Sequence, residues 1–425
     1  MKNLIRKITP SFFLSWYHFL LALLGAILYG FPSRRLKVIG VTGTKGKSTV
    51  VELAGQILKE AGYKIASISS IRFKIGDKEW LNDLKMTMPG RLKLQRFLKE
   101  AVDSGCQYAI IEVTSEGILQ HRHRFIDFDV VVFTNLSPEH IERHGSFEKY
   151  REAKGKLFQA CSKVHILNLD DENVNYFLKF KAERKFSFSI FRDQISLKGP
   201  ALVIRASDIK ERTGGVSFKV EGIEFNLHLF GEFNIYNALA AICIGLSQEA
   251  SLGVCKRALE RTERIAGRME AIIERPFKVI VDYAHTPDSL EKVYQTLTHQ
   301  LINSSTHQLI CVLGAAGGGR DKWKRPVMGK IAAKYCNEII LTNEDPYDEN
   351  PIKIIEEIAA GARAQEKIKK ILDRKKAIRT ALSLARPGDT VIITGKGSEP
   401  WMCVAGGKKI PWDDRKVVKE LLSEI

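Results

Sequence analysis

A glycine-rich segment at residues 43–49 has the residue types of a loop that holds the phosphates of a nucleotide. Glycines let backbone N–H groups approach phosphate oxygens closely, and a helix that starts at the end of the loop adds partial positive charge. Lys47 would reach the β- and γ-phosphates, and the hydroxyl of Ser48 would be a ligand of Mg²⁺. The loop residues expected to bind ATP are Gly43, Thr44, Lys45, Gly46, Lys47, Ser48 and Thr49.

The elements next to this loop are those that phosphate binding needs. Residues 36–42 are predicted to form a strand, and residues 47–61 a helix that Gly62 ends. The loop lacks the first Gly of the general phosphate-binding loop, and Thr stands at position 42. A turn without a ligand could have the same letters, but the order of strand, loop and helix favours ATP binding.

Short β-branched runs alternate with helical periodicity along the rest of the chain, which predicts an α/β fold. Near-continuous apolar runs predict buried parallel strands at 108–113, 130–134 and 164–169. Residues 186–230 alternate between apolar and polar residues, which suggests an antiparallel patch.

A second α/β unit is predicted to begin near Gly267. Its expected strands are 278–281, 309–313, 338–341 and 390–394, and each ends in a loop rich in Gly, Asp, His or Pro. Ligands bind at such carboxyl ends of open parallel sheets. We therefore expect a P-loop ATPase central domain with a parallel sheet at 37–265 and a Rossmann-like α/β domain at 266–425.

An apolar segment precedes both domains. Residues 12–31 contain no Asp, Glu, Lys or Arg and have about the length that spans a bilayer. Cations flank the segment at both ends and therefore indicate no orientation, and no small-residue cleavage site follows it. Three interpretations of residues 1–36 stay open: a membrane anchor, an interfacial helix, and a helix docked on the protein's own core.

The composition limits the classes of partner. The formal net charge is +17, which suits a nucleotide, an acidic peptide, nucleic acid or anionic lipid. Aromatic residues are not interleaved with the cations as base stacking requires, so no nucleic-acid partner is expected. The seven Cys form no C-x-x-C pair, which indicates buried reduced thiols in a cytoplasmic protein, not a zinc site or a disulfide framework.

The short loop and a series of later segments resemble those of the Mur ligases. They read E-V-T-S-E-G-I at 112–118, T-N-L-S-P-E-H at 134–140, Y-R-E-A-K at 150–154, G-E-F-N at 231–234, G-R-M-E at 267–270, D-Y-A-H-T-P-D at 282–288, G-G-R-D-K at 318–322 and G-K-G-S-E at 395–399. The match is collinear from about residue 37 to the end. The strongest likeness is to the family's tripeptide synthetases, which add the third residue of the peptidoglycan stem peptide, and folylpolyglutamate synthetase is a weaker match.

This resemblance implies a ligase that uses ATP to convert a carboxylate to an acyl phosphate, which an amine then attacks. The catalytic residues that it implies are Lys47, Glu112, His140 and Lys154. Ser48 and Glu112 would hold one Mg²⁺. His140 and Lys154 would lie at a second Mg²⁺, with Lys154 carbamylated by CO₂, because a free ammonium cannot bind a cation.

The resemblance also implies substrate contacts. Expected nucleotide contacts outside the loop are Asn135, Asn234, Arg268 and Asp282, and expected acyl-substrate contacts are Thr87, Thr114, Gln120 and Arg122. Met88 stands where the family has Thr, and Glu116 stands where it has His. Both differences weaken the case for an ordinary UDP-muramoyl dipeptide.

The residues expected to bind the incoming amino acid are Arg320, Glu344, Asp345, Tyr347, Gly395 and Glu399. Family members that add diaminopimelate have D-N-P-R where this chain has E-D-P-Y, and their Arg pairs with the distal carboxylate. Tyr347 lacks that charge, and Glu344 and Asp345 add negative charge. Lysine, or another amino acid with a distal cation, is therefore favoured over diaminopimelate.

The identity of the acyl substrate stays open. Tripeptide synthetases carry an N-terminal domain for the uridine nucleotide, and about 36 residues precede the first predicted strand here. A lipid-linked precursor, or an acidic peptide as in folylpolyglutamate and cyanophycin ligases, is an alternative. So is a nucleotide-binding subunit that does not ligate, although the full catalytic set argues against it. We expect a cytoplasmic monomer, with membrane contact through residues 12–31 left open.

Overall fold

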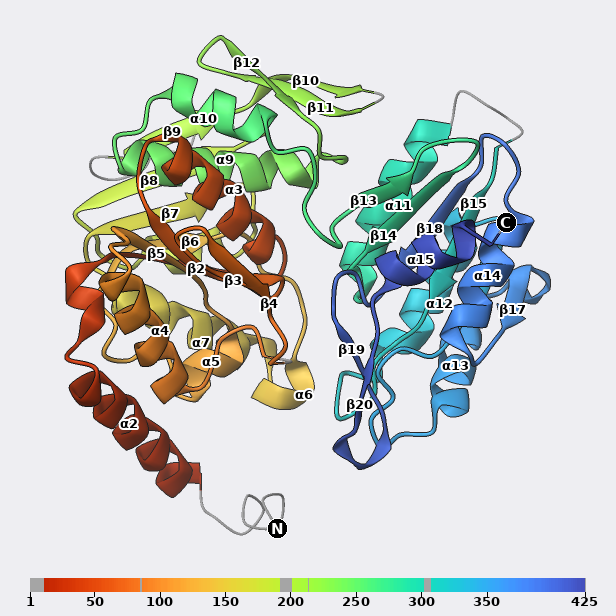
Figure 1. Cartoon of the computed structure of the whole chain (residues 1–425), viewed down its shortest axis with the longest axis horizontal. Coiled ribbons are helices and arrows are strands. Elements are labelled where there is room, and N and C mark those ends of the chain that lie inside the picture. Colours follow the sequence, from red (N-terminus) through yellow and green to blue (C-terminus); the bar gives the residue numbers. More distant parts are fainter. Residues whose placement is uncertain (1–10, 85, 192–200, 213, 302–306, 425) are drawn as a thin grey trace.

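The computed structural model describes residues 11–84, 86–191, 201–212, 214–301 and 307–424. Two α/β units lie side by side, each with a sheet flanked by helices (Figure 1). We call them the central unit (residues 37–260) and the C-terminal unit (residues 270–424). The α/β class predicted from the sequence is confirmed.

The central unit is built on a nine-stranded sheet in the order β4-β3-β2-β5-β1-β6-β7-β8-β9. In this spatial order, the neighbouring strands β2-β5-β1-β6-β7-β8-β9 are all parallel to one another. The strands β3 and β4 lie at one edge, and they pair antiparallel, β3 with β2 and β4 with β3. The middle strands are buried on both faces, as their apolar runs require. The strands are β1 (Lys37–Thr42), β2 (Ile65–Ile68), β3 (Arg72–Ile75), β4 (Lys78–Leu81), β5 (Tyr108–Glu112), β6 (Phe128–Phe133), β7 (Val164–Asn168), β8 (Arg184–Ser189) and β9 (Ala201–Arg205).

Helices cover both faces of this sheet, so that two apolar cores form. On one face lie α3 (Lys47–Glu60), α9 (Phe233–Ser247) and α10 (Leu252–Glu260). On the other lie α4 (Arg91–Asp103), α5 (Ser115–Leu119), α7 (Phe147–Gln159) and α8 (Val174–Leu178), with α6 (Ile141–His144) leading into α7.

The phosphate loop joins β1 to α3, as predicted. Gly46 precedes the helix with a φ of 81°, a backbone conformation that favours glycine. A Cβ atom on Gly43 would lie 1.9 Å from Oγ1 of Thr134, so a side chain at position 43 does not fit. These two glycines therefore allow the tight path of the loop.

The antiparallel patch predicted at 186–230 is smaller than expected. Only β10 (Ser207–Arg212), β11 (Gly215–Val220) and β12 (Ile223–Leu227) form an antiparallel sheet. The strands β8 and β9 instead extend the parallel sheet beyond β7. The polar residues Ser187 and Ser189 of β8 are buried, so alternation there does not mark an exposed face. The edge strand is β9, in which Leu202 and Arg205 are exposed.

The C-terminal unit has a six-stranded sheet in the order β13-β14-β18-β15-β16-β17, parallel except for β13. Its strands are β13 (Glu270–Ile273), β14 (Lys278–Asp282), β15 (Leu309–Leu313), β16 (Glu338–Leu341), β17 (Ile368–Lys370) and β18 (Thr390–Thr394). Its helices are α11 (Pro287–Leu301), α12 (Lys324–Tyr335), α13 (Pro351–Ala359), η2 (Gln365–Lys367), α14 (Arg374–Leu384) and α15 (Asp414–Leu422). A hairpin of β19 (Trp401–Cys403) and β20 (Lys409–Pro411), with η3 (Ala405–Gly407) between them, follows β18.

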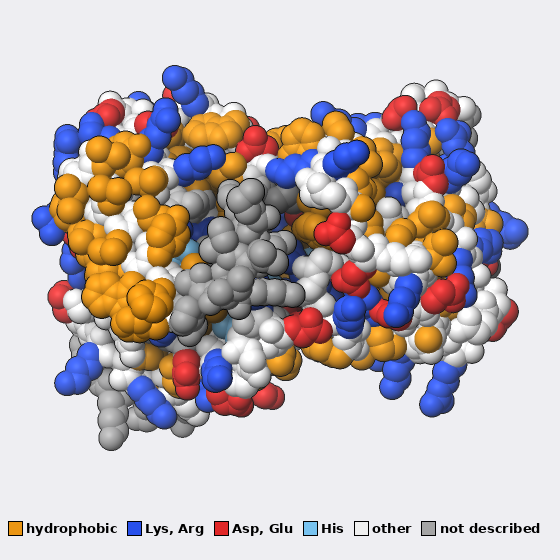
Figure 2. Space-filling view, turned by 90° about the horizontal axis from the view of Figure 1, so that it is seen from below, with side chains coloured by type: hydrophobic (Ala, Val, Ile, Leu, Met, Phe, Trp, Pro, Cys, Tyr) orange, Lys and Arg blue, Asp and Glu red, His pale blue; other side chains and the backbone are white. Residues whose placement is uncertain are grey.

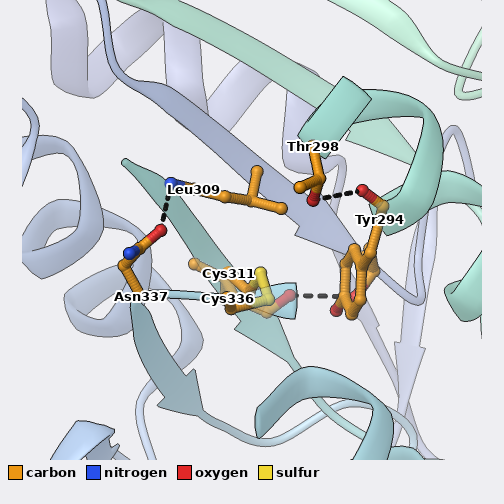
Figure 3. The surroundings of a disulfide bond; sticks show 8 residues. Tyr294, Thr298, Leu309, Cys311, Cys336 and Asn337 are labelled. Carbon is orange, nitrogen blue, oxygen red and sulfur yellow. Dashed lines mark hydrogen bonds between the residues drawn. A yellow bond between two sulfur atoms is a disulfide. The ribbon is translucent and has the colours of Figure 1, made fainter. Parts of the chain in front are cut away.

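The prediction that the thiols are reduced is wrong for two cysteines. Cys311 and Cys336 form a disulfide, with their Cα atoms 6.1 Å apart (Figure 3). The pairing of β15 with β16 brings them together, since Cys311 lies in β15 and Cys336 lies just before β16. The other five cysteines are free and buried, as predicted.

The apolar N-terminal segment contains a helix, α2 (Ser11–Leu28), followed by η1 (Pro32–Arg35). Gly25 of α2 faces Leu92 and Gln95 of α4, and Oγ of Ser15 lies 2.8 Å from Nε2 of His121. One side of the helix is therefore docked on the central unit. In the part of the chain that the structure describes, no helix has both the length and the apolar character needed to cross a membrane.

Candidate active site

A cavity of about 830 Å³ opens between the two units and is lined by residues of both, and we call it the cleft. Part of its lining comes from loops that follow the carboxyl ends of parallel strands in each sheet, where ligands bind in such folds, and helices α9 and α11 add further residues. All the predicted site residues line the cleft except Gly43 and Lys154. These two contact each other at the start of the phosphate loop.

The carboxylate of Glu112, at the end of β5, lies against the phosphate loop. Its Oε2 accepts hydrogen bonds from Oγ of Ser48 at 2.7 Å and from the backbone N–H of Ser70 at 2.9 Å. Nζ of Lys47 lies 3.9 Å from Oε1 of Glu112 and donates to the Thr44 carbonyl at 2.8 Å. Burial lowers the pKa of Lys47, and the charge of Glu112 opposes that shift.

The oxygens of Ser48 and Glu112 fit Mg²⁺, which prefers hard oxygen ligands and keeps several waters. Among the described residues, no group of three or more His, Cys, Asp and Glu could hold a metal ion. The ligands offered to a Mg²⁺ ion at this place would be the Ser48 hydroxyl, the Glu112 carboxylate and the phosphates of the nucleotide. That set agrees with the chemistry expected of the loop.

Lys154 of α7 is 1% exposed, and its Nζ donates to the Gly43 carbonyl at 2.8 Å. The same nitrogen lies 4.6 Å from the centre of the Tyr150 ring. Burial, and after it the charge of Lys47, holds the pKa of Lys154 well below its ordinary value. A neutral amine is the form that reacts with CO₂, so these surroundings fit the carbamate expected at this position.

His140 begins α6 with a φ of 58°, and its ring lies 5.9 Å from that of Tyr150. Burial lowers the pKa of His140 to about 4, with Glu139 opposing the shift. The ring is therefore neutral near pH 7, and a neutral imidazole can accept a hydrogen bond or bind a metal ion.

The predicted nucleotide contacts of the central unit are held in place by local hydrogen bonds. Oδ1 of Asn135 accepts from the backbone N–H of Lys45 at 2.8 Å, which fixes the phosphate loop to the end of β6. Nδ2 of Asn234 donates to the Phe230 carbonyl at 2.7 Å, and its Oδ1 accepts from Asn237 at 2.9 Å. Both asparagines also line the cleft.

Arg268 lies just before β13, the first strand of the C-terminal unit, and contacts the central unit. Its Nη2 donates to Oγ of Ser70 at 3.2 Å, and its guanidinium lies 4.3 Å from the centre of the Tyr283 ring. The carboxylate of Asp282 accepts from the backbone N–H groups of Met269 at 2.7 Å and Ala284 at 2.6 Å. Asp282 thus shapes the loop that presents Arg268 beside the phosphate end of the cleft.

The predicted acyl-substrate contacts form a polar group at another part of the cleft. Arg122 donates to Oε1 of Gln120 at 2.7 Å and to the Met88 carbonyl. Gln120 donates to Oε1 of Glu116 at 3.3 Å, and Arg143 donates to the same oxygen at 2.7 Å. Glu116, which stands where the family has His, therefore partly neutralises the arginines here.

The two other residues predicted to contact the acyl substrate are Thr114 and Thr87. The hydroxyl of Thr114 caps α5 by accepting from the backbone N–H of Gly117. Thr87 is partly exposed and lines the cleft. The side chain of Met88 is buried against Gly117, since a Cβ there would lie 2.6 Å from its sulfur. Met88 thus packs where the family offers a hydroxyl.

The predicted amino-acid contacts gather in the C-terminal unit. Asp345 accepts from Nζ of Lys396 through both oxygens at 2.9 Å, and Tyr283 donates to Glu399 at 3.3 Å. The Arg320 guanidinium lies 5.8 Å from the centre of the Tyr347 ring.

Glu344 differs from these paired groups. It is 4% exposed, and within the described part of the chain its Oε2 has no hydrogen-bond partner. Burial first, and then the charge of Asp345, raises the pKa of Glu344 to about 7. A Cβ on Gly395 would lie 2.5 Å from this oxygen, so only glycine leaves the Glu344 side chain its space.

Comparison with known proteins decides the family. Residues 41–245 match the model of the Mur ligase middle domain, and residues 267–397 match that of the Mur ligase, glutamate ligase domain. The chain belongs to the Mur ligase family. This Mur ligase is MurE-like: it is an ATP-dependent acid–amino-acid ligase of peptidoglycan precursor synthesis, and its family uses ATP and Mg²⁺.

The relatives include one protein named as a tripeptide synthetase and several named as diaminopimelate ligases. The UDP-N-acetylmuramyl-tripeptide synthetase of Roseiflexus sp. (strain RS-1) is 37% identical, over 95% of this Mur ligase and 82% of that protein. The UDP-N-acetylmuramoyl-L-alanyl-D-glutamate–2,6-diaminopimelate ligase of Aquifex aeolicus (strain VF5) is 39% identical, over 93% and 79%. A solved structure of a ligase with the same name is 29% identical with a TM-score of 0.61, covering 92% and 78%.

Glu139 is a site residue of this Mur ligase that the sequence analysis missed. It accepts from Nζ of Lys45 at 2.8 Å and lies 3.8 Å from Nζ of Lys324 and 3.9 Å from Nε2 of His285. Burial alone would raise the pKa of Glu139, but Lys45 and then Lys324 outweigh it and hold the pKa below its usual range. The carboxylate thereby joins the phosphate loop to two residues of the C-terminal unit.

Lys324, the first residue of α12, was missed as well. It is 4% exposed, and burial lowers its pKa while Glu139 opposes that shift. The position of Glu139 beside His140 was the available signal, but nothing in the spacing of Lys324 indicated its neighbour.

Proposed function

We propose that this Mur ligase joins lysine, or a similar amino acid with a distal cation, to the dipeptide carboxylate of a UDP-muramoyl precursor. The observation that carries the choice of amino acid is the buried carboxylate of Glu344, a residue that lines the cleft and whose Oε2 has no partner in the described residues. The charges of Lys396, Arg374 and Lys324 act on this carboxylate, but a buried oxygen without a hydrogen-bond partner is costly unless a donor reaches it. The distal ammonium of lysine would supply this donor.

Neighbouring residues support the same choice. Diaminopimelate carries a carboxylate at its distal end, and the relative in Aquifex aeolicus is named for its use of that amino acid. Here the position of the pairing Arg in such ligases is Tyr347, which has no positive charge. Asp345 and Glu399 add two more carboxylates around Lys396. A distal carboxylate would meet repulsion here, whereas an ammonium would be attracted.

We infer the following division of roles. Lys47 and Arg268 would neutralise the γ-phosphate while the substrate carboxylate attacks it and ADP leaves. Arg320 would bind the α-carboxylate of the amino acid, whose amine then attacks the acyl carbon as phosphate leaves. Mg²⁺ supplies charge neutralisation for the two anions that must meet.

Lys154 has its own part in this proposal. As a carbamate it would be an anionic oxygen ligand close to His140, at the second Mg²⁺ site. Its burial and its lowered pKa support this role, because both favour the neutral amine that CO₂ modifies.

An ADP-release assay tests the choice of amino acid. The UDP-muramoyl dipeptide is supplied with lysine, ornithine, diaminopimelate or glutamate in turn, and the product is identified by mass. We expect turnover with lysine to exceed that with diaminopimelate by at least ~10-fold, as one well-placed charge pair allows. Efficient use of diaminopimelate without use of lysine would contradict the proposal. ADP release without any peptide product would contradict ligation itself.

A further inference from the structure

The helix α2 has an apolar surface on the side that does not pack against the central unit. Exposed large apolar side chains follow its length, and we call them the α2 stripe: Phe12, Phe13, Trp16, Tyr17, Leu20, Leu24, Ile27 and Leu28. Each is more than half exposed. In the space-filling view from the side where α2 lies, hydrophobic side chains gather over one end of the molecule (Figure 2). A contiguous apolar surface of this kind marks an interaction site more often than a free surface.

The opposite side of α2 is already occupied. Ala22, Gly25 and Ala26 are buried, and Gly25 faces Leu92 and Gln95. The helix is thus held in place before any partner arrives. Its apolar residues outside this contact are not needed for the core of the central unit.

The charged residues that flank α2 in the sequence are all cations. The sequence has no Asp or Glu before Glu52, and its N-terminal cations are Lys2, Arg6 and Lys7. Past the helix, Arg34 and Arg35 are exposed, and Nε of Arg34 lies 3.5 Å from the exposed carboxylate of Asp127. An apolar helix surface that is flanked by cations in the sequence has the composition that binds a bilayer with anionic lipids.

We propose that the α2 stripe docks on the surface of an anionic lipid bilayer, with α2 lying in the plane of the interface. The aromatic residues of the stripe suit this depth, because Trp and Tyr are enriched where one end of a side chain is apolar and the other wet. A second copy of the chain is a poorer partner, since like charges would be brought together in a pair of such helices. Anionic headgroups neutralise them instead.

This docking would place one end of the cleft near the bilayer. Ser15 of α2 contacts His121, and His121 lies between Gln120 and Arg122, the predicted acyl-substrate contacts. The acyl end of the cleft therefore adjoins the docked helix. The inference rests on the surface of α2 and its charges, and it does not depend on which amino acid is added.

Vesicle co-sedimentation of the full-length chain tests the docking. Vesicles of phosphatidylcholine alone are compared with vesicles of phosphatidylcholine and phosphatidylglycerol, at low and high salt. We expect binding to the mixed vesicles to be at least ~10-fold stronger and to weaken with salt, because cations near a surface are attracted by anionic lipid. No binding to either vesicle by the full-length chain would overturn the proposal.

Two matched triple variants test whether the α2 stripe is the surface that binds the vesicles. Phe13→Gln, Tyr17→Gln and Leu20→Gln together should reduce vesicle binding at least ~10-fold, since apolar area drives interfacial binding. The control combines Ile352→Gln, Leu372→Gln and Ile410→Gln, which are exposed apolar residues of the C-terminal unit, and should bind as the unaltered chain does. Equal loss in both variants, or no loss in the first, would overturn the assignment. Unchanged ADP release without vesicles shows that both variants are folded.

Sedimentation velocity without lipid tests the alternative, in which a second copy of the chain covers the α2 stripe. We expect the full-length chain and the stripe variant to sediment alike. Self-association that the stripe variant abolishes, together with no vesicle binding, would show that a second copy covers α2 and would overturn the proposal.

Discussion

Nζ of Lys154 lies 2.8 Å from the carbonyl oxygen of Gly43, so the middle of α7 is joined to the first residue of the phosphate loop. The two residues are 111 positions apart in the chain. The contact is buried, and Tyr150 covers it from one side. A lysine in this position can change the loop and the metal site together, which makes it the first residue to test.

Removing the Lys154 amine should abolish most of the ligase activity. For Lys154→Ala we expect a fall in kcat of at least ~100-fold, the scale seen when a group that stabilises developing charge is lost. In CO₂-depleted buffer the unaltered enzyme should lose activity and recover it with bicarbonate. The matched control is Lys156→Ala, an exposed lysine of the same helix. Carbamylation would be contradicted if the activity did not depend on CO₂ and if no ¹³C carbamate signal appeared after addition of labelled bicarbonate.

Ser48→Ala should weaken Mg²⁺ use and leave the fold intact. The hydroxyl donates to Glu112 at 2.7 Å, so its loss removes one oxygen of the site and one hydrogen bond of the carboxylate. We expect the Mg²⁺ concentration for half-maximal activity to rise at least ~10-fold, as for the loss of one ligand or its support. Chelation of Mg²⁺ should stop ADP release in the unaltered enzyme. A variant with unchanged Mg²⁺ dependence would place the ion elsewhere.

Glu344 should make the free enzyme less stable as the pH rises. Its folded pKa of about 7 is above the ordinary value of 4.5, so the folded state holds the proton longer than the unfolded chain. The free energy of unfolding then falls between pH 4.5 and 7 by at most about 3 kcal/mol, because each tenfold difference in proton affinity is worth about 1.4 kcal/mol. Thermal melts should therefore show Glu344→Gln more stable than the unaltered chain at pH 8 and equal to it near pH 4.5.

The ionisation of Glu344 should also affect the use of lysine as a substrate. Ionised Glu344 is the form that attracts an ammonium, so kcat/KM for lysine should rise with pH through about 7. In Glu344→Gln this rise should disappear. A pH profile for lysine that the substitution leaves unchanged would remove Glu344 from the recognition of the substrate.

Tyr347→Arg should shift the choice of amino acid toward diaminopimelate. The new guanidinium can pair bidentately with a distal carboxylate, whereas the tyrosine ring cannot. We expect the ratio of kcat/KM for diaminopimelate over lysine to rise at least ~10-fold. Tyr347→Phe is the control and should keep the original preference. If both variants prefer the same amino acid as the unaltered enzyme, position 347 is not a determinant.

Glu139→Gln should loosen the contact between the two units. The substitution leaves Lys45 and Lys324 without their shared carboxylate, and unpaired buried charges are costly. We expect kcat/KM for ATP to fall at least ~10-fold and small-angle scattering to report a larger radius of gyration. Glu152→Gln, at an exposed position of α7, should change neither. Lost activity with an unchanged radius would mean that Glu139 acts only on the phosphate loop.

The local patterns of the chain were enough for much of the fold. The phosphate loop and the strand and helix beside it are contiguous in sequence, so residue order already specifies their geometry. The predicted start of α3 is Lys47, and the structure agrees. The buried strands β5, β6 and β7 were found because their apolar runs reflect burial on both faces.

The local sequence patterns could not predict which distant segments of the chain pair with each other. The alternation in residues 186–230 says which side chains are apolar, but not that β8 and β9 join the parallel sheet. Cys311 and Cys336 are 25 residues apart, and only the pairing of β15 with β16 brings them together. Likewise, hydropathy identified α2 as apolar but did not show which side packs on α4.

For the candidate site too, some properties followed from the sequence and others depended on the tertiary structure. Residue types and their order pointed to an ATP-dependent ligase and identified many of the residues that line the cleft, because each motif is short and local. The charge states of those residues came from the folded chain: Glu139 meets Lys324 of the other unit, and Glu344 is buried without a partner for its Oε2 among the described residues. Burial and neighbouring charge set a pKa, and both depend on which distant segments the fold brings into contact.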